Sequence, residues 1–324
     1  MNAPVASLAF LGLTALMTAA LCVGYPVLTP LQLGAALAGD GPGWLQTLVL
    51  NIRLPRLGAA LVVGSALGLS GMLLQTLARN RLASPDVLGL NDGALLALAL
   101  TLLLSPSAVL GPWWCALLGA LATAGFTLVA AGGVGTQGYR VLVVGLGIAS
   151  LLRAGFDIAM ATLPIFHASG LYAFSVGSLA GRTGALVTTS AMVLAVLLAA
   201  SLPLLRPLAL LGLHDDSMRS LGLHPERLRL WVLLLAAALA GLAVSLAGPV
   251  GFVAIAAPIF ARHLPGAGVA PFWGSALLGA ALVIAADVAG RLLAQPAEVP
   301  AGVVTGLLGG PFLLWLLMRP GGAQ

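Results

Sequence analysis

Four ionisable side chains stand inside long apolar stretches of this sequence, where they could do chemistry. Arg153 and Asp157 are four residues apart, and Asp287 and Arg291 repeat that spacing. Residues four apart lie on one face of a helix, so each pair can neutralise itself. A charge buried in lipid is costly unless it is paired or wetted. Each pair is therefore either structural or part of a polar pathway, and such carboxylates are also what a proton relay requires.

The other reactive side chains do not form a catalytic or metal-binding set. All fourteen basic residues are arginine, and without lysine there is no phosphate-binding glycine loop followed by Lys-Ser/Thr. The four histidines lack paired ligand spacing, and both cysteines lie in apolar stretches. These residues are His167, His214, His224, His263, Cys22 and Cys115. We expect no enzyme activity, no cofactor and no metal site on this chain.

The composition predicts the helices that must carry these residues. The 324 residues are 60% hydrophobic and only 7% charged, with a mean hydropathy of +1.10, whereas soluble domains are about 25% charged. We predict an all-α polytopic membrane protein, a single domain over residues 1–324, with about ten transmembrane helices in one bundle. The first predicted span lacks the basic n-region of a cleaved signal peptide, so we expect it to be retained as a helix. The predicted spans are 5–25, 56–77, 88–104, 112–131, 141–162, 186–205, 228–247, 250–264, 272–293 and 302–318.

The arginines favour one orientation in the membrane. An even number of spans places both termini on one side, and if that side is the cytoplasm, nine arginines lie inside and four outside, as the positive-inside rule predicts. The inner ones are Arg79, Arg81, Arg140, Arg206, Arg219, Arg227, Arg229, Arg262 and Arg319, and the outer ones are Arg53, Arg56, Arg182 and Arg291. The pI near 10.2 therefore reflects orientation and does not indicate nucleic-acid binding.

One face of the second span consists of small residues. Gly64, Ser65, Gly68, Ser70 and Gly71 recur at spacings of three and four. Because such a face is nearly bare backbone, it predicts close packing on another helix within the membrane.

Two segments between spans have a pattern of their own. Residues 169–183 are too few to cross the membrane and too apolar for an ordinary loop, so we predict a short helix against the outer end of the bundle. Residues 208–229 form the longest polar segment, in which Asp215 and Asp216 suit the start of a helix and Gly222 suits its end. This amphipathic segment is either a solvated loop or a docking helix.

Short motifs along most of the chain match a known family in order. In the first half they are Arg53-Leu-Pro-Arg56, Leu69-Ser-Gly71, Gln75, Asn80 with Leu82-Ala83, Leu88-Gly89 and Gly93. In the second half they are Leu246-Ala-Gly248-Pro249-Val-Gly251-Phe252, Pro258, Arg262, Asp287, Arg291, residues 298–305, Gly309 and Pro311-Phe312. From about Arg53 to Arg319 the chain resembles the permease subunits of ABC importers for iron-siderophores, haem and cobalamin. It departs at Arg81, where proline is usual, at Ile259, where histidine is usual, and at Asn91-Asp92, so the exact substrate stays open.

The resemblance implies roles for three groups of residues. A periplasmic binding protein would dock on Arg53, Arg56 and Arg291. A cytoplasmic coupling helix, fitting a groove of the ATPase, would comprise Asp215, Asp216, Arg219, Ser220, Leu221 and Gly222. A cytoplasmic gate would comprise Asn80 and Leu82. Two alternatives remain, since the outer arginines could simply snorkel at helix ends and Asn80 could cap the following helix.

The implied complex contains a second permease subunit, identical or not, two cytoplasmic ATPase subunits that bind ATP and Mg, and the periplasmic binding protein. It would lie in the bacterial inner membrane, with both termini of this chain cytoplasmic, and convert ATPase closure into alternating access. The rival interpretation is an ion- or proton-coupled secondary transporter that uses Arg153, Asp157 and Asp287 without an ATPase. Neither that rival nor a non-transporting scaffold explains segment 208–229 or the outer arginines.

Overall fold

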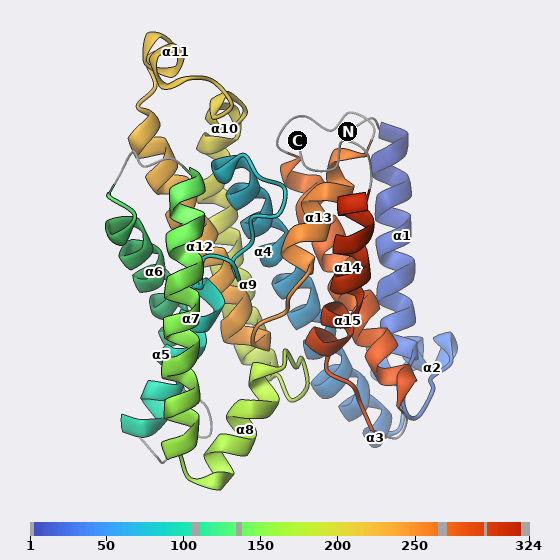
Figure 1. Ribbon diagram of the computed structural model, residues 1–324. Coiled ribbons are helices and arrows are strands. Elements are labelled where there is room, and N and C mark those ends of the chain that lie inside the picture. Colours follow the sequence, from blue (N-terminus) through green and yellow to red (C-terminus); the bar gives the residue numbers. More distant parts are fainter. Residues whose placement is uncertain (1–2, 105–110, 134–137, 265–270, 295–296, 319–324) are drawn as a thin grey trace.

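The computed structural model describes residues 3–104, 111–133, 138–264, 271–294 and 297–318. Within these ranges every regular element is a helix, which confirms the predicted all-α class (Figure 1). The elements are α1 (Ala3–Cys22), α2 (Pro30–Ala38), α3 (Gly43–Gln46), η1 (Thr47–Arg53), α4 (Leu54–Ala78), α5 (Leu90–Leu104), α6 (Trp113–Ala130), α7 (Gly138–Thr162), α8 (Ile165–Ser175), α9 (Gly184–Ser201), η2 (Leu202–Leu204), α10 (Leu205–Leu210), α11 (Asp215–Ser220), α12 (Pro225–Ala247), α13 (Val253–Arg262), α14 (Phe272–Leu293) and α15 (Ala301–Met318).

The apolar helices correspond to the predicted spans. Among the described residues, six helices are long and apolar enough to cross a membrane: Gly43–Ala78, Trp113–Ala131, Arg140–Thr162, Gly184–Leu210, Pro225–Ala247 and Phe272–Leu293. Four shorter apolar helices are Leu11–Cys22, Leu90–Leu104, Val253–Arg262 and Ala301–Leu316. Each overlaps one predicted span, so the prediction of a polytopic helical bundle is confirmed.

The stretch between the first two spans contains a helix that we did not predict. Thr29 precedes α2, and its hydroxyl accepts from the Gln32 N–H at 3.3 Å while the Gln32 side chain accepts from the Thr29 N–H at 2.9 Å. This reciprocal pair is a capping box, which starts a helix by satisfying free main-chain donors. Gly39 ends α2 with a φ of +83°, a conformation that glycine adopts without strain.

The second span begins earlier than predicted, at Gly43 instead of position 56. The predicted start was the charged motif Arg53-Leu-Pro-Arg56, which bounds the apolar run. In the structure the π-helical turns of η1 lead directly into α4. Such widened turns are common where a helix must accommodate a local irregularity.

Helix α4 lies at the centre of the bundle and packs against α12, α13 and α14. The predicted small-residue face makes this packing close. A Cβ atom at Gly64 would stand 2.6 Å from the Cα atom of Ala280 on α14, and one at Gly71 would stand 2.6 Å from the carbonyl carbon of Ala254 on α13. Since no side chain fits at these distances, the prediction of close packing on this face is confirmed.

The two ends of the bundle differ in what they carry (Figure 1). Helices α10 and α11 lie at one end, together with the beginning of α1 and the end of α15. Helices α2, α3 and α8 lie at the other. We call these the α11 end and the α8 end. The chain thus starts its first helix and finishes its last at the same end, as an even number of spans predicts.

The short helix expected at residues 169–183 exists but is displaced along the chain. Helix α8 begins directly after Pro164 and ends at Ser175. The predicted second half instead forms turns in which Gly177 and Gly181 have φ values of +82° and +70°. These left-handed glycines terminate the helix, and Thr183 then caps α9 by accepting from the Leu186 N–H.

Candidate functional site

Two buried arginines bind the end of α1 at the α8 end of the bundle. Arg53 on η1 and Arg291 on α14 are only 5% and 6% exposed. Arg53 donates to the carbonyl oxygens of Leu21 (2.6 Å), Cys22 (3.1 Å) and Pro26 (2.5 Å), and Arg291 donates to those of Ala20 and Val23 (both 2.9 Å). The last carbonyls of a helix have no partner within it. These two side chains therefore complete the hydrogen bonding of α1.

Asp287 joins Arg291 to the third arginine of this end. Its buried carboxylate pairs with Arg291 at 2.9 Å and with Arg56 at 2.8 Å, which confirms the expected Asp287–Arg291 pair. Arg56 also pairs with Glu298 at 2.6 Å, and the side chains of Arg56 and Glu298 are 12% and 46% exposed. Of the three arginines predicted to dock a binding protein, only Arg56 thus reaches the surface, beside an acid. The docking role itself stays a prediction.

A second ionic cluster lies on an exposed face of α7. The expected pair of Arg153 and Asp157 forms at 3.5 Å, and Asp92 on α5 adds a third charge at 3.8 Å from Arg153. The side chains of Arg153 and Asp157 are 52% and 62% exposed in the single chain. Charges at this depth do not face hydrocarbon at low cost. This face of α7 must therefore border water or another polar surface.

The polar segment 208–229 forms α10, α11 and the beginning of α12 at the α11 end. Asp215 and Asp216 start α11 as predicted, and Asp215 pairs with Arg229 at 2.5 Å. The hydrogen bonds from Arg229 hold the pKa of Asp215 below its ordinary value. Arg219 pairs with Asp216 at 3.5 Å and with Glu226 at 2.6 Å. Ion pairs thus tie α11 to α12.

The expected coupling residues complete one turn of helix followed by a reversal. Ser220 ends α11 and Leu221 follows as an exposed cap residue. Gly222 has a φ of +79°, and its N–H donates to the Arg219 carbonyl at 2.9 Å. Met218 is fully buried, which anchors the turn. The segment is therefore a compact amphipathic unit, as predicted, and not an unstructured loop.

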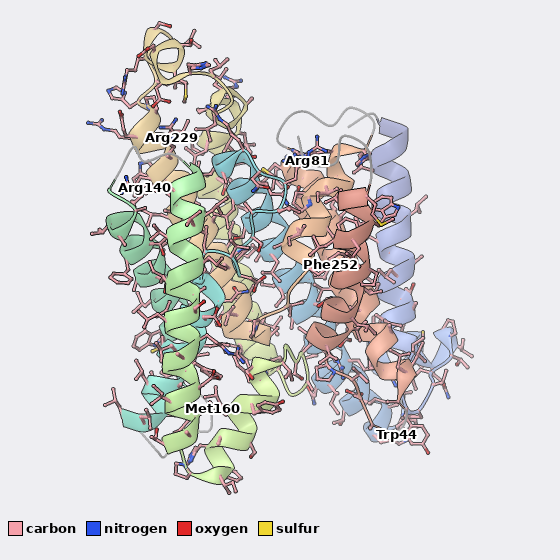
Figure 2. All side chains as sticks on the ribbon, viewed as in Figure 1. Trp44, Arg81, Arg140, Met160, Arg229 and Phe252 are labelled. Atoms are coloured by element: carbon pink, nitrogen blue, oxygen red, sulfur yellow. The ribbon has the colours of Figure 1, made fainter. Side chains whose placement is uncertain are left out.

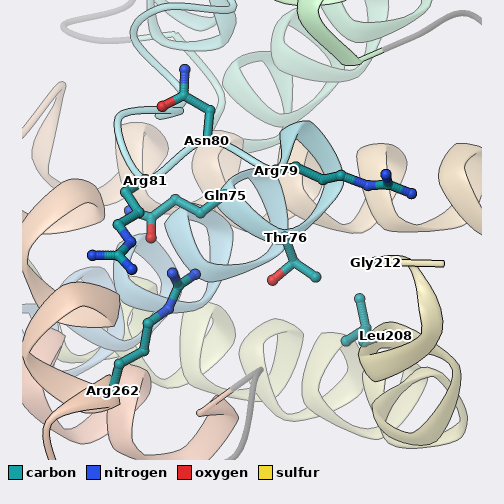
Figure 3. A pocket seen from close by; sticks show the side chains of 8 residues that line it. All are labelled: Gln75, Thr76, Arg79, Asn80, Arg81, Leu208, Gly212 and Arg262. Carbon is teal, nitrogen blue, oxygen red and sulfur yellow. The ribbon is translucent and has the colours of Figure 1, made fainter. Parts of the chain in front are cut away.

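The two residues expected at a gate follow α4 directly. The side chain of Asn80 accepts from the main-chain N–H of Leu82 at 2.9 Å, so it stabilises a turn, and no regular helix begins there before Leu90. A cavity of about 230 Å³ opens beside them (Figure 3). Its lining residues are Gln75, Thr76, Arg79, Asn80, Arg81, Leu208, Gly212 and Arg262.

The positions that depart from the family pattern have distinct surroundings. Asn91 donates to Asp86 at 2.5 Å, and Asp92 contacts Arg153, so these two departures are paired within the chain. Burial raises the pKa of Asp86 above its ordinary value. Ile259 is buried. Arg81, in contrast, lines the cavity.

Three acidic residues to which the sequence assigned no role contribute to these contacts. They are Asp86, Asp92 and Glu298, and each pairs with a residue that the sequence did identify or question. The described residues contain no group of three or more His, Cys, Asp or Glu that could hold a metal ion.

Apolar helices long enough to cross a membrane, with charges on one of them and a polar helical unit beyond one end, make this chain a polytopic membrane protein. A family model, described as the FecCD transport family, matches residues 12–319. The chain belongs to the FecCD transport family. It is a permease subunit of an ABC importer, and the family implies a complex with an ATPase and a binding protein.

Known proteins similar to this chain include three curated permeases. The ferric enterobactin transport system permease protein FepG of Escherichia coli is 37% identical over 290 residues, which cover 89% of this chain and 87% of that protein. The Fe(3+) dicitrate permease protein FecC of Escherichia coli is 36% identical, covering 89% and 88%. The hemin permease protein HmuU of Yersinia pestis is 37% identical, covering 83% of each.

A solved structure shares the fold. It is a metal-chelate type ABC transporter in an inward-facing conformation, with a TM-score of 0.82, 23% identity, and coverage of 96% of this chain and 98% of that one. This likeness confirms that the elements of Figure 1 form the permease fold.

Proposed function

We propose that this chain is half of a dimeric transmembrane core that imports a ferric chelate or haem across the bacterial inner membrane. Its relatives are named for ferric enterobactin, ferric dicitrate and hemin. Two ATPase subunits that bind ATP and Mg would drive transport, and a periplasmic binding protein would deliver the ligand. We propose one transmembrane domain over residues 1–324, with both termini cytoplasmic, because the inner arginines then outnumber the outer ones.

The structural feature that supports an ATPase as the energy source is the unit formed by α10 and α11. Ion pairs within α11 and between α11 and α12 hold this unit, and Leu221, directly after α11, is exposed. An exposed leucine on a rigid, charged turn suits insertion into a groove of another protein. Asp215, Asp216, Arg219, Ser220, Leu221 and Gly222 would form this coupling helix. A carrier that works alone has no use for such a unit.

The transport pathway would run along the ionic face of α7, against the second permease subunit. The contrast with α9 supports this placement. Both helices expose large apolar residues, but α9 has no charged residue, whereas α7 also exposes Arg153 and Asp157. Asn80 and Leu82 would gate the cytoplasmic end, since a polar and an apolar residue together can form a constriction.

Uptake into membrane vesicles tests this function against the proton-coupled rival. With the cognate chelate and binding protein present, we expect uptake to require ATP hydrolysis and to survive collapse of the proton gradient. Gly222→Leu should abolish uptake and co-purification of the ATPase, because a leucine is strained at a positive φ. Gly222→Asn is the matched control, since asparagine tolerates this conformation and should retain both. Uptake that needs a proton gradient and no ATPase would overturn the proposal.

A further inference from the structure

The cavity at the α11 end of α4 is lined by an unusual set of charges. Arg79 and Arg81 follow α4, and Arg262 ends α13. No acidic residue lines the cavity, and within the described ranges no carboxylate pairs with Arg81 or Arg262. Their guanidinium groups nevertheless point toward one another beside Gln75 (Figure 3). Like charges placed together without an acid repel, unless an anion compensates them.

Arg79 differs from Arg81 and Arg262 in its hydrogen bonding. Arg79 donates through Nε and Nη2 to the carbonyl oxygen of Leu211, at 3.0 and 2.6 Å, and again to that of Leu213. Its role is to hold the chain that leads to α11. Arg262 is half-buried, and its Nε is fully buried with no hydrogen-bond partner. A buried guanidinium donor left without a partner is costly, so this group is set up for an acceptor that comes from outside.

Gln75 supplies a matching acceptor. Its side chain is held in place by donation from Nε2 to the Ile255 carbonyl at 3.2 Å, and the residue is 2% exposed. Its Oε1 is buried without a partner. Gln75, Arg81 and Arg262 line one cavity of about 230 Å³, so its wall contains a cation and two residues with an unpartnered donor or acceptor.

We propose that this cavity binds a phosphate-type oxyanion that carries a hydroxyl group. Arg81 and Arg262 would contact its charged oxygens through charge-assisted hydrogen bonds. Its hydroxyl would donate to Gln75 Oε1, a contact that sulfate and carboxylates cannot make at neutral pH. The source is either free phosphate, whose P–OH group would donate, or the headgroup of phosphatidylglycerol, whose glycerol hydroxyl would donate because a phosphodiester has no P–OH. The bound anion would join the ends of α4 and α13 to the segment of α10, next to the proposed coupling helix.

Binding of inorganic phosphate to the purified full-length permease in neutral detergent tests the site. We expect saturable binding by calorimetry, tighter than that of sulfate, and a rise in thermal stability that sodium chloride at equal ionic strength does not reproduce. Arg81→Gln and Arg262→Gln should each weaken binding about ten-fold, the loss of one charge-assisted hydrogen bond. Gln75→Met should remove the preference for phosphate over sulfate.

Arg140→Gln is the matched control. It removes the same charge from the same end of the molecule, but Arg140 lies at the start of α7, outside the cavity (Figure 2). It should leave phosphate binding unchanged. A second arm distinguishes the two sources by native mass spectrometry of the permease from bilayers that contain phosphatidylglycerol. If the wild type retains phosphatidylglycerol and Arg262→Gln loses it, the lipid headgroup is a ligand of the cavity. If phosphate displaces the lipid, both ligands share this site.

Two results would overturn the proposal. One is the absence of saturable binding of both phosphate and phosphatidylglycerol to the wild type. The other is binding that Arg81→Gln and Arg262→Gln leave as strong as in Arg140→Gln. Because these assays do not involve uptake or the ATPase, their outcome is independent of the proposed transport function.

Discussion

Two arginine clusters, one at each end of the bundle, differ in their partners. At the α8 end, Arg53, Arg56 and Arg291 are surrounded by two carboxylates and by main-chain carbonyl oxygens. At the α11 end, Arg81 and Arg262 share a cavity in which no acid lies. A charge that stabilises the fold comes with partners from the same chain. A charge without one is a candidate for a ligand or a partner protein, because its compensation must come from elsewhere.

The largest effect should follow removal of the shared acid at the α8 end. Asp287→Asn leaves two largely buried guanidinium groups without their common counter-charge, so we expect a loss of about 3–5 kcal/mol in the free energy of unfolding. Thermal or denaturant unfolding of the purified protein measures it. The control is Asp216→Asn, which removes a fully exposed acid on α11 and should leave stability unchanged. Equal stability of the two variants would contradict the comparison.

The same substitution at both ends should then give effects of opposite sign. Arg291→Gln removes hydrogen bonds to the end of α1 and unpairs Asp287, so we expect a loss of about 2–3 kcal/mol. Arg262→Gln removes a repulsion and an unsatisfied donor, so in phosphate-free buffer it should be neutral or slightly stabilising. Hydrogen exchange at the end of α1 should rise only in Arg291→Gln. A large destabilisation by Arg262→Gln would show that the α11 end also uses its arginines structurally.

The sequence predicts the features that depend on local spacing. An apolar run of about twenty residues reports directly on the thickness of the bilayer, so the spans could be located. The pairs Arg153–Asp157 and Asp287–Arg291 can be predicted from the sequence because residues four apart lie on one helical face. The small-residue face of α4 can be predicted for the same reason. The capping box before α2 also has a local signal, Thr29 followed three residues later by Gln32.

The sequence could not predict the partners that come from distant segments. Glu298 meets Arg56 across 242 positions, and nothing in the local pattern joins them. Arg53 and Arg291 bind main-chain carbonyls, which every residue has and which therefore leave no sequence signal. The arginines expected to dock a binding protein are Arg53, Arg56 and Arg291, and the structure buries two of these three. The unsatisfied state of Arg262 likewise exists only once its neighbours are placed.

A smaller effect concerns Arg56, which alone among the three docking candidates is partly exposed. If Arg56 and Glu298 form the docking surface for a binding protein, Arg56→Gln should slow association several-fold and flatten its dependence on salt, because steering acts over a Debye length of about 8 Å. Stopped-flow or surface-based kinetics with the cognate binding protein measures this. Arg206→Gln, at the opposite end, should change neither quantity. Association that is insensitive to salt and to Arg56→Gln would favour a purely structural role for this arginine.

The smallest predicted effect tests whether arginines without an acidic partner occur throughout the α11 end or only in the cavity. Arg229 lies at that end (Figure 2) but pairs with Asp215 at 2.5 Å. Because the folded-state pKa of Asp215 is depressed below 3.8, the pair stabilises α11 above about pH 4 and loses its effect as the pH falls through that lowered pKa. Both side chains are partly exposed, so we expect no more than about 1 kcal/mol. Hydrogen exchange within α11, corrected for its intrinsic pH dependence, should therefore rise below pH 4 in wild type. In Asp215→Asn it should be high at every pH. An unchanged protection of α11 in that variant would mean that the buried Met218, and not the ion pair, holds this helix in place.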